Sequence, residues 1–254
     1  MAGKALIEHG RFLEVLGIEV ELLAEAARAA PVDTPVPACP GFTIGEVARH
    51  VGGVYRVARR WLTDGEAPRE WPRNPAPGQS IEDYLRTGLA ELLGELSGHD
   101  PREGAAGWWP QDQTYGFWMR RLAHETTVHR YDVQEAAGTP VTPIAEDLAT
   151  DGVDEALAVW FGGRLPMLGL SGTTGRSVAV QVAGHQWIAR AGPGETEARR
   201  CSAEEAAQAD GLVSGSPMPV YLWLWGRQGH QSVTWDGDED AIGQFWALLR
   251  LATR

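Results

Sequence analysis

The stretch WMRRLAHETTVHRYD, residues 118–132, predicts a single helix on which the rest of the chain can be organised. Glu125 and His129 are four residues apart, so at 100° per residue their side chains differ by about 40° and project from one face, one turn apart. This spacing favours metal chelation. His124 lies about 140° around the helix from His129, which places these two histidines poorly for a shared ion. The zincin pattern, which needs two histidines four residues apart, is therefore absent.

Glu125 and His129 supply at most half of a metal site, because a catalytic zinc has three protein ligands and an open position. Helical patterns are also predicted in residues 5–29, 43–62 and 80–98, and the helix around Glu125 extends over 114–137. Four such helices indicate an up-and-down bundle, a fold that builds metal sites from facing helices. His50, near the middle of the second helix, is the natural third ligand.

The ligand set His50, Glu125 and His129 suits Zn²⁺, and on ligand type Fe²⁺ or Ni²⁺ also fits. The plainer interpretation is a solvated Glu–His pair on one helix and an unrelated core histidine on another. Motif matches of this length have a high false-positive rate, so spacing alone leaves both interpretations open.

Composition narrows the possible functions further. The 254 residues carry a net charge of −12, which disfavours nucleic acid or an anionic membrane as a partner. No apolar run approaches the length of a membrane span, and the N-terminus shows no signal-peptide core, so we expect a cytoplasmic protein. Two cysteines are too few for a disulfide framework. Lys4 is the only lysine, which disfavours Schiff-base and pyridoxal chemistry.

The pattern changes in the C-terminal part of the chain. A further helix is predicted over 145–161, and residues 177–182 and 186–191 alternate as a β-hairpin around Gly184 and His185. Short strands at 212–214 and 232–235 and helices at 217–225 and 238–251 complete a small α+β domain. We therefore expect two domains, a helical bundle in residues 1–163 and an α+β domain in residues 164–254.

Three stretches resemble a known family. They are CPGFTIGEVARHV at 39–51, HETTVHRYD at 124–132, and DGLVSGS at 210–216 followed by VYLWLWGR at 220–227. Their order and content are similar to the mycothiol-dependent maleylpyruvate isomerase family of actinobacteria, within the DinB-like metalloenzyme superfamily. The resemblance implies a DinB-like four-helix bundle that binds a divalent metal through His50, Glu125 and His129. It also implies a sterol-carrier-like fold for the C-terminal domain and mycothiol as thiol cosubstrate.

The expected activity follows from this site. Zinc lowers the pKa of a thiol that displaces its bound water, so mycothiol would react as a thiolate at neutral pH. Addition of the thiolate to an electrophilic alkene gives isomerisation if the thiol leaves after bond rotation, and S-transfer if the adduct is released. The partners are then a small thiol and a small electrophile. The sequence fixes neither the substrate nor the oligomeric state.

Two other functional classes compete with this one. A non-catalytic binding module would hold a structural metal in the bundle and an apolar ligand in the C-terminal domain, but structural zinc normally has four protein ligands rather than three. A metal-dependent hydrolase would use zinc to make hydroxide.

Other polar residues near the site have two interpretations each. Arg121, four residues before Glu125, is suited to bind a substrate carboxylate or to form an intrahelical salt bridge with Glu125. Asp132 is placed either to orient the His129 imidazole or as a surface acid. His124 is expected to be a packing residue or an outer partner of a ligand. Cys39 precedes a helix N-terminus, but a structural role is favoured.

The family's catalytic arginine has no unique counterpart in this sequence. Arg69, Arg73 and Arg86 all fall in plausible places, and no motif selects one of them.

Overall fold

The computed structural model describes residues 4–72 and 74–253, which form two compact units. One unit is Glu8–Thr142, and the other combines residues 4–7 with the chain from Pro143 onward. The expected boundary lay about twenty residues later, after Gly163. The difference arises because helix α5 (Glu146–Glu155) packs on helix α8 (Pro217–Leu224) and so belongs to the C-terminal unit.

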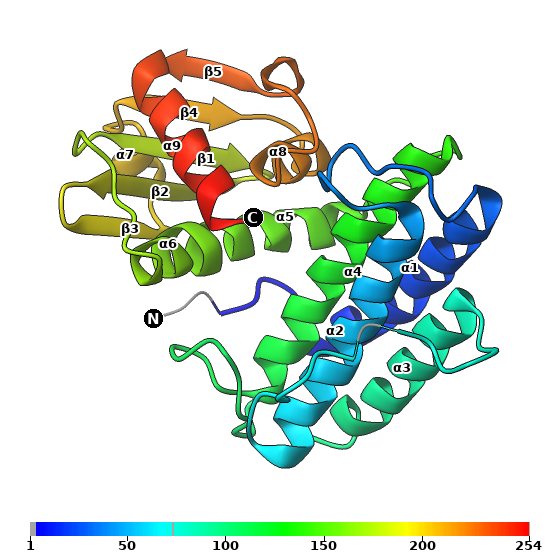
Figure 1. Cartoon of the computed structure of the whole chain (residues 1–254). Helices are drawn as coiled ribbons and strands as arrows, with labels where there is room; N and C mark the ends of the chain where they lie inside the picture. Colours follow the sequence, from blue (N-terminus) through cyan, green and yellow to red (C-terminus); the bar gives the residue numbers. More distant parts are fainter. Residues whose placement is uncertain (1–3, 73, 254) are drawn as a thin grey trace. The chain divides into compact units, whose positions relative to one another are not determined.

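The N-terminal unit is a bundle of four helices, α1 (His9–Ala29), α2 (Ile44–Asp64), α3 (Ile81–Leu96) and α4 (Tyr115–Ala137). Helix α1 packs most extensively on α4, and α2 on α3 (Figure 1). Further contacts between α2 and α4 and between α1 and α3 close the bundle. The four-helix architecture expected from the sequence is confirmed.

Local capping explains where the site-bearing helices begin and end. The Thr43 hydroxyl accepts a hydrogen bond from the Glu46 amide, and the Glu46 carboxylate accepts one from the Thr43 amide, which completes the predicted capping box of α2. At the first turn of α4 the Thr114 hydroxyl accepts a hydrogen bond from the Phe117 amide. Gly138 ends α4 with a φ of 67°, a left-handed conformation that glycine adopts without strain.

The C-terminal unit is an α+β domain with one mixed five-stranded sheet in the order β3-β2-β1-β4-β5. Strands β1 and β2 form the predicted hairpin, β4 lies parallel to β1, and β5 pairs antiparallel with β4. The strands are β1 (Ser177–Val182), β2 (His185–Gly192), β3 (Glu195–Arg200), β4 (Gly211–Ser214) and β5 (Thr234–Gly237). The predicted α+β class is confirmed.

Helical segments complete this unit. After α5, a π-helix, η1 (Ala156–Arg164), takes the last six residues of the helix predicted over 145–161 and continues three residues beyond it. The remaining elements are α6 (Leu165–Met167), α7 (Ala203–Ala206), α8, the 3₁₀ turn η2 (His230–Ser232) and α9 (Glu239–Ala252). The core of the unit contains the fully buried side chains of Trp187 and Trp223. Within the described ranges, none of the helices is both long enough and apolar enough to cross a membrane.

Candidate functional site

The central helix of the bundle reaches the solvent at two places. Helix α4 buries 18 of its 23 residues, as expected for a helix packed on nearly all sides. Between Tyr115 and Gln134, Glu125 and His129 are the only two residues that are not buried. Within this stretch, the accessible positions are therefore the two side chains whose spacing predicted chelation.

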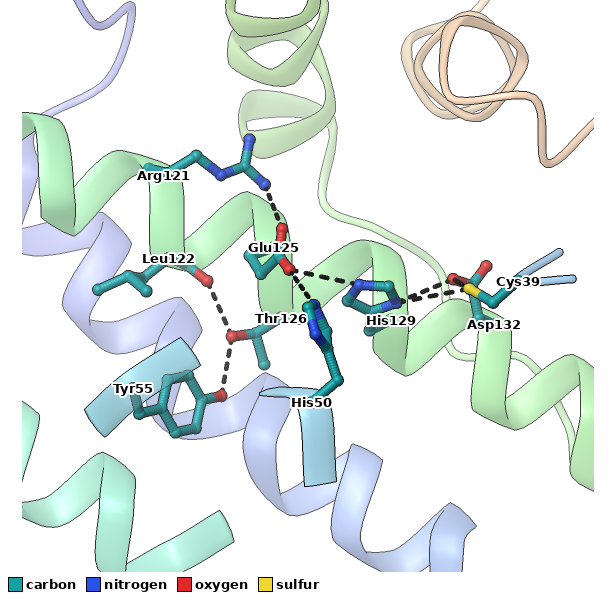
Figure 2. A network of polar contacts seen from close by, with 9 residues as sticks. All are labelled: Cys39, His50, Tyr55, Arg121, Leu122, Glu125, Thr126, His129 and Asp132. Atoms are coloured by element: carbon teal, nitrogen blue, oxygen red, sulfur yellow. Dashed lines mark hydrogen bonds and ion pairs between the residues drawn. The ribbon is translucent and has the colours of Figure 1, made fainter. Parts of the chain in front are cut away.

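His50 extends from α2 to meet this pair, as Figure 2 shows. Its Nε2 lies 3.0 Å from Oε1 of Glu125, and Nε2 of His129 lies 3.4 Å from the same oxygen. One ligand atom from each of the three residues falls within 4.8 Å of the others. The structure thus brings together the three predicted ligands, although their metal-binding role stays a prediction.

The donor set fits a divalent metal. Zinc bonds of about 2.0–2.1 Å arranged tetrahedrally separate neighbouring ligand atoms by about 3.3–3.4 Å. The two distances from Glu125 Oε1 to the imidazole nitrogens are close to that separation. Two imidazoles and one carboxylate leave a tetrahedral ion one position for an exogenous ligand, which is the arrangement of catalytic zinc sites.

The other ring nitrogen of His129 faces a second group of polar atoms. Its Nδ1 lies 3.1 Å from Oδ2 of Asp132, a carboxylate that is almost fully buried, and 3.9 Å from Sγ of Cys39. The Cys39 thiol in turn donates to Asp132 at 3.3 Å. An imidazole whose Nδ1–H is held by a carboxylate presents Nε2 as a lone-pair donor, as in carboxylate–histidine–zinc arrangements. Asp132 therefore has the position of an orienting partner and not of a surface acid.

Opposing charges govern ionisation in the metal-free cluster. Burial alone would raise the pKa of the Glu125 carboxyl, but hydrogen bonds from His129 and His50 and the charge of Arg121 hold this pKa well below its usual range. Burial alone would lower the pKa of His129, but its hydrogen bonds to Asp132, Cys39 and Glu125 hold that pKa well above the ordinary value. Without metal, these interactions favour an ionised Glu125 carboxylate paired with a protonated His129 imidazole.

Arg121 forms the intrahelical pair that was one of its two interpretations. Its Nη2 lies 2.9 Å from Oε2 of Glu125, and its side chain is 5 % exposed. The guanidinium fixes the carboxylate oxygen that does not contact the imidazoles. In this structure Arg121 therefore orients Glu125, and contact with a substrate carboxylate remains a proposal.

Two aromatic rings flank His50, and the sequence analysis did not assign either of them to the site. The Trp71 ring, from the loop after α2, is stacked on the His50 imidazole with centroids 6.0 Å apart and planes 10° apart. The Phe42 ring lies 6.1 Å away on the segment before α2. Both side chains are about 40 % exposed. Sequence could suggest them only as bulky apolar residues in Pro-rich loops.

The remaining candidates lie in other settings. His124 is fully buried, with its ring edge-on to Phe12 at 5.9 Å, which agrees with a packing role. Arg86 pairs with Glu21 on the surface, at 2.8 Å, and Arg69 lines a cavity next to Trp71. Arg73 lies outside the described residues.

These features define a class of protein: a helical bundle carrying a His–Glu–His cluster with one accessible face, joined to a small α+β domain. Residues 14–134 match the family model of the mycothiol maleylpyruvate isomerase N-terminal domain. This match spans most of the helical unit, which therefore carries the N-terminal domain of that family. The family resemblance predicted from the sequence is confirmed.

Solved structures support the same fold over most of the chain. A crystal structure of the mycothiol-dependent maleylpyruvate isomerase matches with a TM-score of 0.58 and 14 % identity, covering 91 % of this chain and 95 % of that one. A histidine-to-alanine mutant of that enzyme matches with a TM-score of 0.57 over the same shares and at the same identity. Comparison with curated proteins gave no significant match.

Proposed function

We propose that this chain is a metal-dependent enzyme that uses a small thiol, mycothiol, on a small electrophilic substrate. The observation that carries the proposal is the convergence of His50 with Glu125 and His129, the two accessible residues of α4 between Tyr115 and Gln134. The family match and the likeness to the isomerase structures support an enzyme of the same type. A thiol cosubstrate also agrees with a cytoplasmic location, where thiols stay reduced.

A divalent metal held by this cluster, for which Zn²⁺ fits best, would lower the pKa of a bound thiol so that it is a thiolate at neutral pH. Neighbouring side chains of the protein already orient the candidate metal ligands. Asp132 fixes the His129 ring, and Arg121 fixes one oxygen of Glu125 while the other points to both imidazoles. The ligand atoms are therefore held near their working positions before any ion binds.

The proposed reaction requires no oxidant or reductant. The thiolate sulfur forms a C–S bond to one carbon of an electron-poor alkene, and the alkene's electron pair moves onto the conjugated carbonyl. Rotation about the resulting single bond and loss of the thiolate give the cis/trans isomer. Protonation and release of the adduct give S-transfer instead. Maleylpyruvate is the first substrate to test, because it is an alkene conjugated to a carbonyl and is the substrate named for the matching structures.

The test begins with metal. Purified protein is assayed for bound metal, and consumption of maleylpyruvate is then followed with and without mycothiol. We expect about one divalent ion per chain and turnover that requires both the metal and the thiol. Turnover without thiol would support a metal-dependent hydrolase instead, and a protein that binds no divalent metal would overturn the proposal.

Substitutions of the three candidate ligands test whether metal binding and activity depend on them. His50→Ala, Glu125→Gln and His129→Ala are each expected to lose the metal and to lower kcat/KM by more than about a hundredfold, because loss of an outer-shell partner alone costs ten- to a hundredfold. His185→Ala, at an exposed position in β2, is the matched control and should retain both metal and activity. Full activity in any of the three ligand variants would contradict the assignment.

A further inference from the structure

Exposed aromatic side chains gather at one place in this molecule. The sequence contains 21 Trp, Tyr and Phe residues, yet Phe42 and Trp71 are the only exposed ones within residues 4–72 and 74–253. Both rings lie about 6 Å from the ring of His50. Because burial of such rings is strongly favourable, rings left in solvent beside a candidate site indicate a surface for a ligand.

Close packing of its loop against α2 and a hydrogen bond from α3 hold Trp71 in place. A Cβ atom on Gly53 would come within 2.6 Å of Nε1 of Trp71 and 2.8 Å of the Pro72 carbonyl, so the absence of a side chain at Gly53 lets the loop lie against α2. The Pro72 carbonyl also accepts a 2.5 Å hydrogen bond from the hydroxyl of Tyr84 on α3. The loop is therefore fastened to two helices at the residues that carry the ring.

This loop and the end of α2 line a cavity of 590 Å³, within the size range of small-molecule sites. Trp71 belongs to its lining and also stacks on His50, so one ring borders both the cavity and the candidate metal site. Charged side chains of both signs make up much of the rest of the lining, namely Arg60, Asp64, Glu66, Arg69 and Glu70.

This composition selects between ligand classes. Two arginines against three carboxylates give a formal charge of −1, which opposes the binding of a small dianion such as a dicarboxylate. Carboxylates accept hydrogen bonds from hydroxyl groups, and guanidiniums donate to them. A tryptophan face meanwhile accepts the apolar C–H face of a ring. Mixed charges around one indole thus suit a polyhydroxylated sugar or cyclitol.

We infer that this cavity holds the sugar and cyclitol part of the thiol cosubstrate, with Trp71 as the stacking platform beside His50. The inference rests on the proposed function and adds to it the place where the non-reacting part of the thiol binds. Mycothiol is a cysteine derivative linked to an amino sugar and a cyclitol, so its sulfur would extend past Trp71 toward the His–Glu–His cluster while its rings occupy the cavity.

Thiol selectivity tests the inference. We measure kcat/KM with mycothiol and with N-acetylcysteine, which lacks the rings, and take the ratio. Wild type should prefer mycothiol, and Trp71→Ala should lower the ratio about tenfold, because one stacking platform contributes on the order of 1.4 kcal/mol. Trp71→Phe should keep most of the preference. Metal content is measured in every variant.

Two arginine substitutions, one in the cavity and one elsewhere on the bundle, serve as a test variant and its matched control. Arg69→Gln removes a hydrogen-bond donor from the cavity and should lower the ratio, whereas Arg86→Gln removes an arginine paired with Glu21 elsewhere on the bundle and should leave the ratio unchanged. An equal loss for both thiols in Trp71→Ala would mean that the ring only supports His50, and it would overturn the inference. So would a wild-type ratio near one.

A binding experiment separates this inference from the proposed function. The ring fragment of mycothiol without its cysteine is titrated into wild type and Trp71→Ala by calorimetry, which needs no turnover. Binding to wild type that is weakened at least about tenfold by Trp71→Ala supports the cavity, even if no thiol-dependent reaction is found. Absence of binding to wild type, or equal binding to both proteins, overturns it even if the enzyme is active.

Discussion

Helix α4 carries two charged groups that illustrate opposite uses of burial. On one side, Glu125 and His129 converge with His50 at the solvent-accessible place on the helix. Arg130 lies about 140° around the helix from Glu125 and is completely buried. It donates to both oxygens of Glu19 at 2.6 and 3.1 Å, to Gln134 at 3.0 Å and to the Thr142 carbonyl at 2.6 Å.

The difference lies in how the polar groups are satisfied. At Arg130 each charge has its partner within the protein, so nothing remains for a ligand. At Glu125 one carboxylate oxygen is shared by two imidazoles, and all three groups are partly accessible. A fully paired ion network stabilises the bundle, whereas a set of Lewis bases converging on one accessible point is suited to receive a cation.

The largest effect on stability should come from breaking the buried pair. Arg130→Met leaves Glu19 buried without its cation and should lower the free energy of unfolding by about 3–5 kcal/mol. Urea unfolding of the metal-free protein measures it. The double variant Arg130→Met with Glu19→Met should recover much of the loss, since no charge is then left unpaired. A loss below about 1 kcal/mol in the single variant would contradict a structural role for this pair.

A smaller effect is expected behind the candidate metal site. Asp132→Asn keeps the shape of the side chain but removes the charge that orients His129, and metal affinity should fall about ten- to a hundredfold. Competition with a chromophoric chelator measures the affinity. Cys39→Ser, which keeps a donor to Asp132, serves as the comparison and should change affinity less. Equal effects of the two substitutions on metal affinity would contradict the role of Asp132 in orienting His129.

The metal-free protein should lose stability as the pH rises. The pKa of His129 is raised in the folded state, so its contribution is fully present below the unfolded value of about 6.5 and is lost as the pH rises through the folded pKa. The slope is at most about 1.4 kcal/mol per pH unit for one proton. Urea midpoints at pH 6 to 9 with a chelator present measure it. Asp132→Asn should flatten the dependence, and a rise in stability over this range would contradict the assignment.

The smallest effect is expected at the cap of α2. Thr43→Ala removes the hydroxyl that accepts from the Glu46 amide and should cost about 1 kcal/mol of stability. Thermal unfolding measures it. Metal affinity should stay within about twofold, since His50 lies two turns further along the helix. A large loss of metal would show that the cap positions His50 and does more than stabilise its helix.

Much of the fold could be predicted because its signals are local. The capping box at Thr43 and the glycine at 138 marked helix ends, and alternation over 177–182 marked a strand. Strand β3 was missed because its sequence, ETEARR, is charged and lacks that alternation. The compact units divide at Pro143 and not after Gly163, because the packing of α5 on α8 is a tertiary contact with no counterpart in the local pattern.

The residues of the candidate site also fall into those that local sequence patterns predict and those that they do not. Glu125 and His129 follow from helical spacing, and His50 follows from the bundle and the family resemblance. The contact of Cys39 with Asp132, 93 residues apart, and the stacking of Trp71 on His50 come from loops whose course no periodicity describes. Of the two interpretations of Arg121, the structure shows the salt bridge to Glu125.

The two successive glycines in α2 have an evolutionary consequence. A Cβ on Gly52 would come within 2.5 Å of the Tyr84 ring, and one on Gly53 would meet Trp71 almost as closely. Each glycine therefore leaves the space that its neighbouring ring occupies. We expect a substitution that adds a side chain at either position to require a change of that ring as well. Among relatives, we expect a residue with a side chain at position 53 to coincide with loss or relocation of the indole. Covariation of positions 53 and 71 would then identify the family members that keep a tryptophan beside His50.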